Sequence, residues 1–388
     1  MITRRIQFLA ATAIMLAALL LVHSNSAAQA SEPYPGQALC LPEPYLVTPG
    51  NCLPLGPSAT LTELAMQGIS YPPKPLPGSK PPRELAISPV QVARINIAAN
   101  EAVNVYANLD DAAAGINPVR TIAPGALRYL SYVQEASVND NPFVMLRSGE
   151  WVRASPLAGY PMLQGLAFRQ TPTSGFGWAI ETVQPYARAG DWNSQGGRTI
   201  DRWSVIQISE MQVIDNIEWY RIGSEEWLPW NKARRVQVNT TPPQGVTGDR
   251  WIEVNLFNQT MTVYENRQLV FASLVSTGIE PFYTRPGLFQ IYQKKEVETM
   301  SGAFEADRSD YYYLEDVPWT MYFDEARALH GAYWNPFFGW ARTHGCVNLS
   351  IGDSNWLFQW AKEGEWVYVW DPSGETPTDP SLYTEGGA

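Results

Sequence analysis

The chain has 388 residues, 45% of them hydrophobic, and this length exceeds what a single hydrophobic core usually supports. Its 27 basic and 38 acidic residues give a net charge of −11, which argues against nucleic-acid binding and offers no electrostatic attraction to anionic lipid or polymer. The 31 Pro, 29 Gly and 15 Trp favour short strands joined by turns over a helical bundle. We therefore predict a mostly β protein of two or three domains.

Residues 1–30 have the pattern of a signal peptide. Arg4 and Arg5 precede an apolar run over residues 8–22, and Ala28-Gln29-Ala30 is a small-residue cleavage site. The alternative is an uncleaved membrane anchor, because the apolar run is only slightly shorter than a membrane span. Either reading places the bulk of the chain outside the cytoplasm, secreted or associated with the cell wall, with membrane contact only if the signal stays attached.

The chain has three cysteines, an odd number for an exported protein. Cys40 and Cys52 are close in sequence and suit a disulfide that staples a loop, although the sequence leaves this pairing open. Cys346 then remains free. An unpaired thiol is a liability in an oxidising compartment, so its presence indicates a use.

Residues 31–89 are rich in Pro and predict a spacer, with one short helical segment over 61–67. Residues 90–160 and 170–238 repeat one another. Tyr106 is followed by Trp151 in the first repeat, and Tyr186 by Trp227 in the second, in each case between short alternating strands. Both segments resemble bacterial SH3-like modules, which implies two small β-barrels. We expect most of the repeated aromatic residues to belong to barrel cores; wall or peptide binding is the alternative.

Residues 250–372 form a third predicted domain. Three strands are expected around turns at 258–259 and 266–267. Near its end, Ser350 is a suitable cap for a helix over about 352–363, closed by Gly364 and followed by a strand over 366–370. Residues 373–388 are predicted to be a tail.

The candidate catalytic residues lie in this third domain. After residue 30 the chain has only two histidines, His330 and His344, and both lie within the seventeen residues that end at Cys346. A thiol needs a base to become a thiolate at neutral pH, and imidazole is well matched to that task. The pattern His330-Gly331 followed by Thr343-His344-Gly345-Cys346 therefore predicts nucleophilic catalysis.

This pattern resembles the YkuD-type L,D-transpeptidase domain. Ser276-Thr277-Gly278 and the segment 284–289 are similar to further motifs of that family, with Arg285 inserted where many members place Pro directly, and Asn348 stands where the family often has Arg. The resemblance implies that Cys346 is the nucleophile and His330 the general base, with Gly331 orienting the imidazole ring. It also implies that His344, Gly345 and the Cys346 amide line an oxyanion site.

The resemblance implies a two-step acyl transfer on peptidoglycan stem peptides, which serve as donor and acceptor. Cys346 attacks the third stem residue, D-alanine leaves, and an amine resolves the thioester into a 3-3 crosslink or another attachment; hydrolysis would make the enzyme an L,D-carboxypeptidase. No cofactor or metal is expected, and no nucleic acid partner; the oligomeric state is left open.

The segment 333–340 is dense in aromatic residues and lies between His330 and Cys346. It predicts a loop that roofs the active site and excludes water, with Tyr333, Trp340 and Thr343 as substrate-binding residues. The alternative is that these rings only pack the loop down. Thr343 can equally hold a local turn.

Two other readings compete. A zinc site built from His330, His344 and Cys346 lacks an evident fourth ligand. A non-catalytic protein that binds the cell wall through its repeats would leave the Cys and His set without a use.

Overall fold

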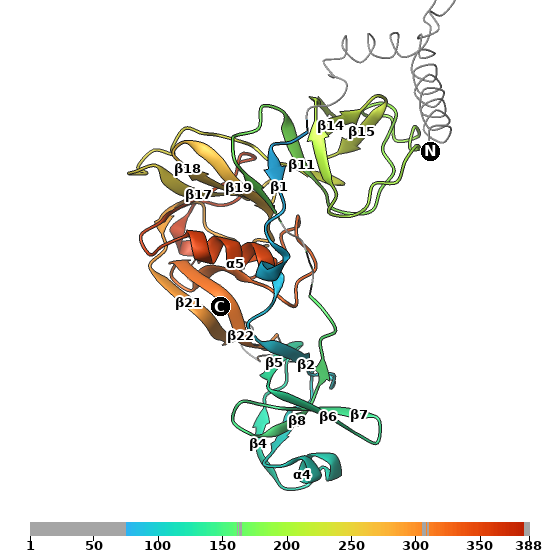
Figure 1. The fold of residues 1–388 in the computed structure, drawn as a ribbon, viewed down its shortest axis with the longest axis vertical. Coiled ribbons are helices and arrows are strands. Elements are labelled where there is room, and N and C mark those ends of the chain that lie inside the picture. Colours follow the sequence, from blue (N-terminus) through green and yellow to red (C-terminus); the bar gives the residue numbers. More distant parts are fainter. Residues whose placement is uncertain (1–74, 161, 163–164, 305–307, 309, 384–388) are drawn as a thin grey trace, which may run out of the picture. The chain divides into compact units, whose positions relative to one another are not determined.

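The computed structural model describes residues 75–383 except for 161, 163–164, 305–307 and 309. The predicted signal peptide, the predicted helical segment at 61–67, Cys40, Cys52 and the last five residues lie outside the described residues. The fold is mostly β, as the composition predicts (Figure 1). No helix among the described residues is both long and apolar enough to span a membrane.

Two sheets form the framework of the third domain. The first sheet has the order β1-β10-β19-β18-β17-β25-β20. Its strands are β1 (Gly78–Ser79), β10 (Leu166–Phe168), β17 (Arg250–Asn255), β18 (Thr260–Glu265), β19 (Gln268–Leu274), β20 (Gly287–Gln290) and β25 (Trp366–Trp370). The predicted turn at 266–267 is confirmed. Asn266 and Arg267 both have positive φ, which suits the turn of a two-residue hairpin.

The second sheet has the order β24-β23-β22-β5-β2-β9, with β21 paired to β22. It contains β2 (Gln91–Arg94), β5 (Leu127–Tyr132), β9 (Ser155–Pro156), β21 (Gln293–Gly302), β22 (Tyr312–Asp324), β23 (Arg327–Gly331) and β24 (Val347–Leu349). This sheet therefore joins strands of the first repeat to strands of the third domain through backbone pairing.

A common core lies between the two sheets and the helix α5 (Ile351–Trp360). Figure 1 shows α5 between strands β17–β19 and the β21–β22 hairpin. Ile252 and Val263 from the first sheet, Met321 and Leu329 from the second and Leu357 from α5 are all fully buried there. Burial of this much apolar surface is the main source of the domain's stability.

The helix α5 begins as predicted. Ser350 caps it, its hydroxyl accepting a hydrogen bond from the Asp353 amide at 3.2 Å. The helix ends at Trp360, three residues before the predicted end. Ala361 is already extended and buried in the core, and Lys294 Nζ donates to the carbonyls of Phe358 and Ala361, so a basic side chain satisfies the last turn.

The strands of the two repeats pair in the same order. In the first repeat β2 pairs with β5 and β9, and the remaining strands form the sheet β4-β3-β8-β7-β6. In the second repeat β11 pairs with β12 and β16, and a second sheet has the order β13-β14-β15. The elements are β3 (Val103–Tyr106), α4 (Leu109–Ala114), β4 (Pro118–Ile122), β6 (Gln134–Val138), β7 (Asn141–Met145), β8 (Trp151–Arg153), β11 (Gly175–Ala179), β12 (Val205–Ile208), β13 (Glu210–Ile214), β14 (Ile217–Gly223), β15 (Glu226–Pro229) and β16 (Ala233–Arg235).

The Tyr and Trp that mark each repeat are cross-strand partners. Tyr106 pairs with Trp151, and Tyr186 pairs with Trp227 through two backbone hydrogen bonds of 2.8 and 2.9 Å. All four rings are buried, which confirms the expectation that they belong to cores. The likeness of the repeats to SH3-like modules stays a prediction.

Residues 75–89 are assigned to the spacer by their composition but belong to the folded unit. Strand β1 pairs with β10, and the short 3-10 helix η1 (Arg83–Ala86) contacts α5. The Asn355 side chain donates to the Leu85 carbonyl at 3.0 Å. Pro-rich composition alone does not reveal such docking, because it depends on partners more than 80 residues away along the chain.

Candidate active site

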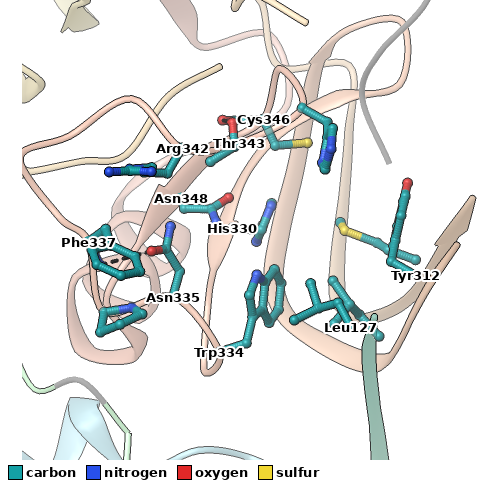
Figure 2. A pocket seen from close by; sticks show the side chains of 14 residues that line it. Leu127, Tyr312, His330, Trp334, Asn335, Phe337, Arg342, Thr343, Cys346 and Asn348 are labelled. Atoms are coloured by element: carbon teal, nitrogen blue, oxygen red, sulfur yellow. Dashed lines mark hydrogen bonds between the residues drawn. The ribbon is translucent and has the colours of Figure 1, made fainter. Parts of the chain in front are cut away.

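Cys346 and His330 line one pocket of about 290 Å³. His330 lies on β23, and Cys346 immediately precedes β24, which pairs with β23 in parallel. Figure 2 shows both side chains directed into the pocket. The parallel pairing thus brings together the two ends of a sequence motif that are sixteen residues apart.

A tight turn over residues 343–346 presents the thiol. The Thr343 hydroxyl donates to the Cys346 carbonyl at 2.7 Å and accepts from the Gly345 amide at 3.2 Å. Thr284 donates to the Gly345 carbonyl at 2.7 Å from the neighbouring segment. Gly345 has φ of +119°, a conformation that residues with a Cβ rarely adopt. Thr343 therefore holds the turn while it also lines the pocket.

His330 is a buried, neutral imidazole. Its Nδ1 lies 3.2 Å from the Gly331 carbonyl, which can only accept, so Nδ1 carries the proton and Nε2 keeps its lone pair. The ring stacks on Trp334 at a centroid distance of 5.6 Å. Burial lowers the pKa of His330 to about 4, opposed by the bond to Gly331. A Cβ at Gly331 would meet the Ser354 hydroxyl at 2.6 Å, so glycine permits this close approach.

The Cys346 thiol is also held in its neutral form. Burial raises the pKa of Cys346 to about 11, opposed by the Ala328 amide 3.4 Å from the sulfur and by the charge of Arg327. Arg327 is paired with the buried Asp324 at 3.2 Å, and Asp324 also pairs with Arg285. The inserted Arg285, whose side chain is 28% exposed, therefore joins an ion cluster with Asp324 and Arg327, and the Arg327 charge acts on the Cys346 thiol.

His344 lies among aromatic rings. Its ring is 4.6 Å from Phe304 and 5.2 Å from Phe282, centroid to centroid. Burial lowers the pKa of His344, opposed by the charge of Asp310. The side chain lines the same pocket as Cys346. Its position suits a packing or substrate-contact role in neutral form.

The aromatic segment 333–340 divides into two groups. Trp334 and Phe337 line the pocket, and Phe337 is 46% exposed. Tyr333 is buried against Tyr129 and Tyr160, and its hydroxyl donates to the Glu315 carbonyl at 2.7 Å. Phe338 is buried in the core beside the second repeat.

Trp340 stacks under the Arg234 guanidinium, 4.8 Å from the ring centroid. Neither Tyr333 nor Trp340 lines the pocket. Their positions therefore give no support to the prediction that they contact substrate. In the structure both side chains pack against other residues. The positions of Trp334 and Phe337 are compatible with a loop over the pocket, and the buried rings fit the alternative that the segment is packed down.

Several pocket residues carry no signal in the catalytic motif. Leu127 comes from β5 of the first repeat, 219 positions before Cys346, and Met300 and Leu314 come from the β21–β22 hairpin. Asn335 lies within the aromatic segment and Arg342 lies two residues after it, and sequence analysis identifies them only as polar neighbours of the motif. Among the described residues, no group of three or more His, Cys, Asp or Glu side chains is arranged to hold a metal ion.

Comparison with known proteins agrees with this geometry. Residues 249–369 match the family model of the L,D-transpeptidase catalytic domain, YkuD. The chain therefore carries a YkuD L,D-transpeptidase catalytic domain at these positions, which bears out the resemblance noted for the third domain. No curated protein matches the chain.

Solved structures similar to the chain include L,D-transpeptidases. One from Stackebrandtia nassauensis is 25% identical with a TM-score of 0.27, covering 35% of this chain and 60% of that one. The catalytic domain of the E. faecium enzyme is 27% identical with a TM-score of 0.29, covering 32% of this chain and all of that one. The enzyme from Mycobacterium smegmatis is 16% identical with a TM-score of 0.30, covering 53% and 90%.

Proposed function

We propose that the protein is a cysteine-dependent L,D-transpeptidase that acts on peptidoglycan stem peptides. The observation that carries the proposal is the shared pocket of Cys346 and His330, inside a domain that matches the L,D-transpeptidase catalytic family. Cys346 is a free thiol, and His330 offers an unprotonated Nε2 in the same pocket.

In the first step the Cys346 sulfur attacks the carbonyl carbon of the third stem residue. The thiol proton passes to His330 Nε2, the C–N bond to D-alanine breaks, and His330 returns the proton to the leaving amine. An amine of a second stem then attacks the thioester, gives its proton to His330 and releases the thiol. The product is a 3-3 crosslink, or another attachment if a different amine attacks; water in this step would give an L,D-carboxypeptidase.

Before substrate binds, the Cys346 thiol and the His330 imidazole are both neutral, and this determines when the proton moves. A pKa of about 11 for Cys346 and about 4 for His330 mean that the thiol and imidazole exchange no proton at neutral pH before substrate arrives. Proton transfer then accompanies attack, and the charge that develops moves onto the carbonyl oxygen. We assign its stabilisation to the Cys346 amide and the adjoining turn, because the Gly345 amide already donates to Thr343.

We also propose that the enzyme works outside the cytoplasm, exported by residues 1–30. Peptidoglycan crosslinks form there, so this location agrees with the proposed substrate. Mass spectrometry of the exported chain tests it, since cleavage after Ala30 would give a mature chain that begins at Ser31.

The catalytic proposal is tested by intact-protein mass spectrometry. The wild type and a Cys346→Ala control are incubated with a carbapenem and, separately, with a disaccharide tetrapeptide. We expect a covalent adduct on the wild type only, together with release of D-alanine. Folded wild-type protein that forms no adduct and releases no D-alanine would overturn the proposal and favour a wall-binding role.

A further inference from the structure

The pocket has two unlike ends. Figure 2 shows Arg342, Asn335 and Phe337 on one side of His330 and Cys346, and Leu127 and Tyr312 on the other. The second end is largely apolar, because Met300 and Leu314 also line the pocket and pair with each other next to the Tyr312–Leu127 pair. A ligand with one charged and one apolar portion would therefore bind in a single orientation.

Of the residues that the structure describes, Arg342 is the only Arg or Lys that lines the pocket, and no described Asp or Glu lines it. Among the described residues Arg342 forms no salt bridge; its guanidinium lies over the Phe337 ring at 5.4 Å from the centroid. Its backbone is anchored, since the Arg342 amide donates to the Thr277 carbonyl at 2.8 Å. A cation held in place without a counter-charge, next to the reactive thiol, is available for an anionic ligand.

Asn335 supplies a second donor. Its side chain is only 6% exposed, and its Oδ1 accepts from the Phe337 amide at 2.8 Å. That bond turns the carboxamide nitrogen toward the Arg342 side of the pocket (Figure 2). The nitrogen donates to no group in the described part of the chain. Phe337 thus links the two donors, since its ring lies beneath Arg342 and its amide orients Asn335.

We infer that Arg342 and Asn335 form a subsite for the terminal carboxylate of the donor peptide. The inference rests on the proposed function, in which the attacked carbonyl belongs to the residue just before the C-terminal D-alanine. The carboxylate then lies a single residue beyond the attacked carbon, so its subsite and the thiol must share one small pocket. Guanidinium and carboxamide N–H groups are suited to both carboxylate oxygens.

The consequence is selectivity for donors that end one residue after the scissile bond. A stem that continues further, or whose terminal carboxylate is neutralised, leaves the Arg342 guanidinium without its charge partner. The apolar end lined by Leu127 then receives the portion of the donor on the other side of the scissile bond.

The test compares two donors that differ only at the C-terminus, a disaccharide tetrapeptide with a free carboxylate and the same compound as a C-terminal amide. D-Alanine or D-alaninamide release is followed for the wild type, Arg342→Met and Asn335→Asp. Asp at 335 keeps an acceptor for the Phe337 amide but replaces the donor by a negative charge. Arg188→Met, far from the pocket in sequence and exposed in the second repeat, controls for loss of one positive charge.

We expect the wild type and Arg188→Met to prefer the free carboxylate by about 10- to 100-fold in kcat/KM. Arg342→Met should lose most of this preference by slowing the carboxylate donor alone, and Asn335→Asp should lose it further. A variant that merely misfolds would slow both donors equally. A preference retained by Arg342→Met would overturn the subsite, whereas a wild type inactive on both donors and unlabelled by a carbapenem would overturn the proposed function instead.

Discussion

The two repeats share a strand order but contact the catalytic domain in different ways. The first repeat pairs its strand β5 in parallel with β22, so a single sheet continues across both parts. The second repeat uses side chains: Phe176 and Trp178 pack against Trp251 and Tyr264 on the outer face of the first sheet. The two repeats are therefore attached to the catalytic domain differently: the first by backbone pairing and the second by aromatic packing.

Both attachments reach the aromatic segment that borders the active site. Tyr129 of the first repeat packs against Tyr333, at a ring distance of 5.7 Å. From the second repeat, Arg234 donates to the Gly339 carbonyl at 2.9 Å and Arg202 donates to the Pro336 carbonyl. The segment is thus held at both ends by parts of the chain that precede the catalytic domain. The two repeats are therefore separate units that also support the aromatic segment beside the pocket.

The largest effect is expected at the attachment of the second repeat. Arg234 is 1% exposed, its guanidinium lies over Trp230 and Trp340, and it donates to the carbonyls of Gly339 and Trp230. Arg234→Met would leave the Gly339 carbonyl without the Arg234 donor, whereas the Trp230 carbonyl keeps the Ala233 amide at 3.3 Å. Together with the lost packing over Trp230 and Trp340, we expect the free energy of unfolding to fall by about 3 kcal/mol. Chemical denaturation measures this.

The neighbouring Arg235 is the matched control. Among the described residues it forms one ion pair, with Glu218, which is 3.8 Å long and partly exposed, so Arg235→Met should lower the free energy of unfolding by less than about 1 kcal/mol. If both variants lose the same free energy of unfolding, the proposed difference between the residues is wrong. The Arg234 guanidinium over Trp340 would then contribute no more to stability than the partly exposed Arg235.

The stability that the attachment of the first repeat contributes should depend on pH, unlike that of the second repeat. Glu315 accepts from the Ser131 amide at 2.9 Å, and burial raises the pKa of Glu315, opposed by that bond. A carboxyl whose folded pKa is raised contributes stability that is present below its ordinary pKa of 4.5 and is lost as pH rises through the raised value. Glu315→Gln keeps an acceptor for Ser131 and should remove this loss.

The measurement is Tm between pH 4 and pH 8 for the wild type, Glu315→Gln and Arg234→Met. Glu315→Gln should flatten the profile, because a side chain that cannot titrate removes the loss of stability as pH rises. Arg234→Met should lower the whole profile without changing its slope. An unchanged slope in Glu315→Gln would show that this carboxyl titrates as it does in the unfolded chain.

The smallest effect on stability and the most specific effect on activity are expected at Leu127. This side chain is the contribution of the first repeat to the pocket wall. Leu127→Ala should raise KM for the tetrapeptide donor about 3- to 10-fold through lost apolar contact, at a cost in stability of about 1 kcal/mol. Val133→Ala is the control, because Val133 is 53% exposed and does not line the pocket. Identical KM values for both variants would limit the first repeat to a supporting role.

The sequence alone was sufficient for the features that depend on neighbours along the chain. The hairpin turn at Asn266-Arg267, the Ser350 cap and the strand at 366–370 follow from turn, capping and alternation chemistry within a few residues. The Cys346 and His330 pattern belongs to the same class, because its residues lie within a seventeen-residue segment that a parallel strand pair closes.

Only the tertiary structure decided which distant segments complete the site. Leu127 in the pocket wall, Ser131 bonded to Glu315 and Arg234 bonded to Gly339 join positions 105 to 219 residues apart, counted along the chain. Such contacts arise from sheet continuation and the packing of whole faces, which impose no fixed spacing or residue type on the sequence. The motif determined the candidate reactive atoms of Cys346 and His330, and the long-range packing determined the shape and charge of the pocket around them.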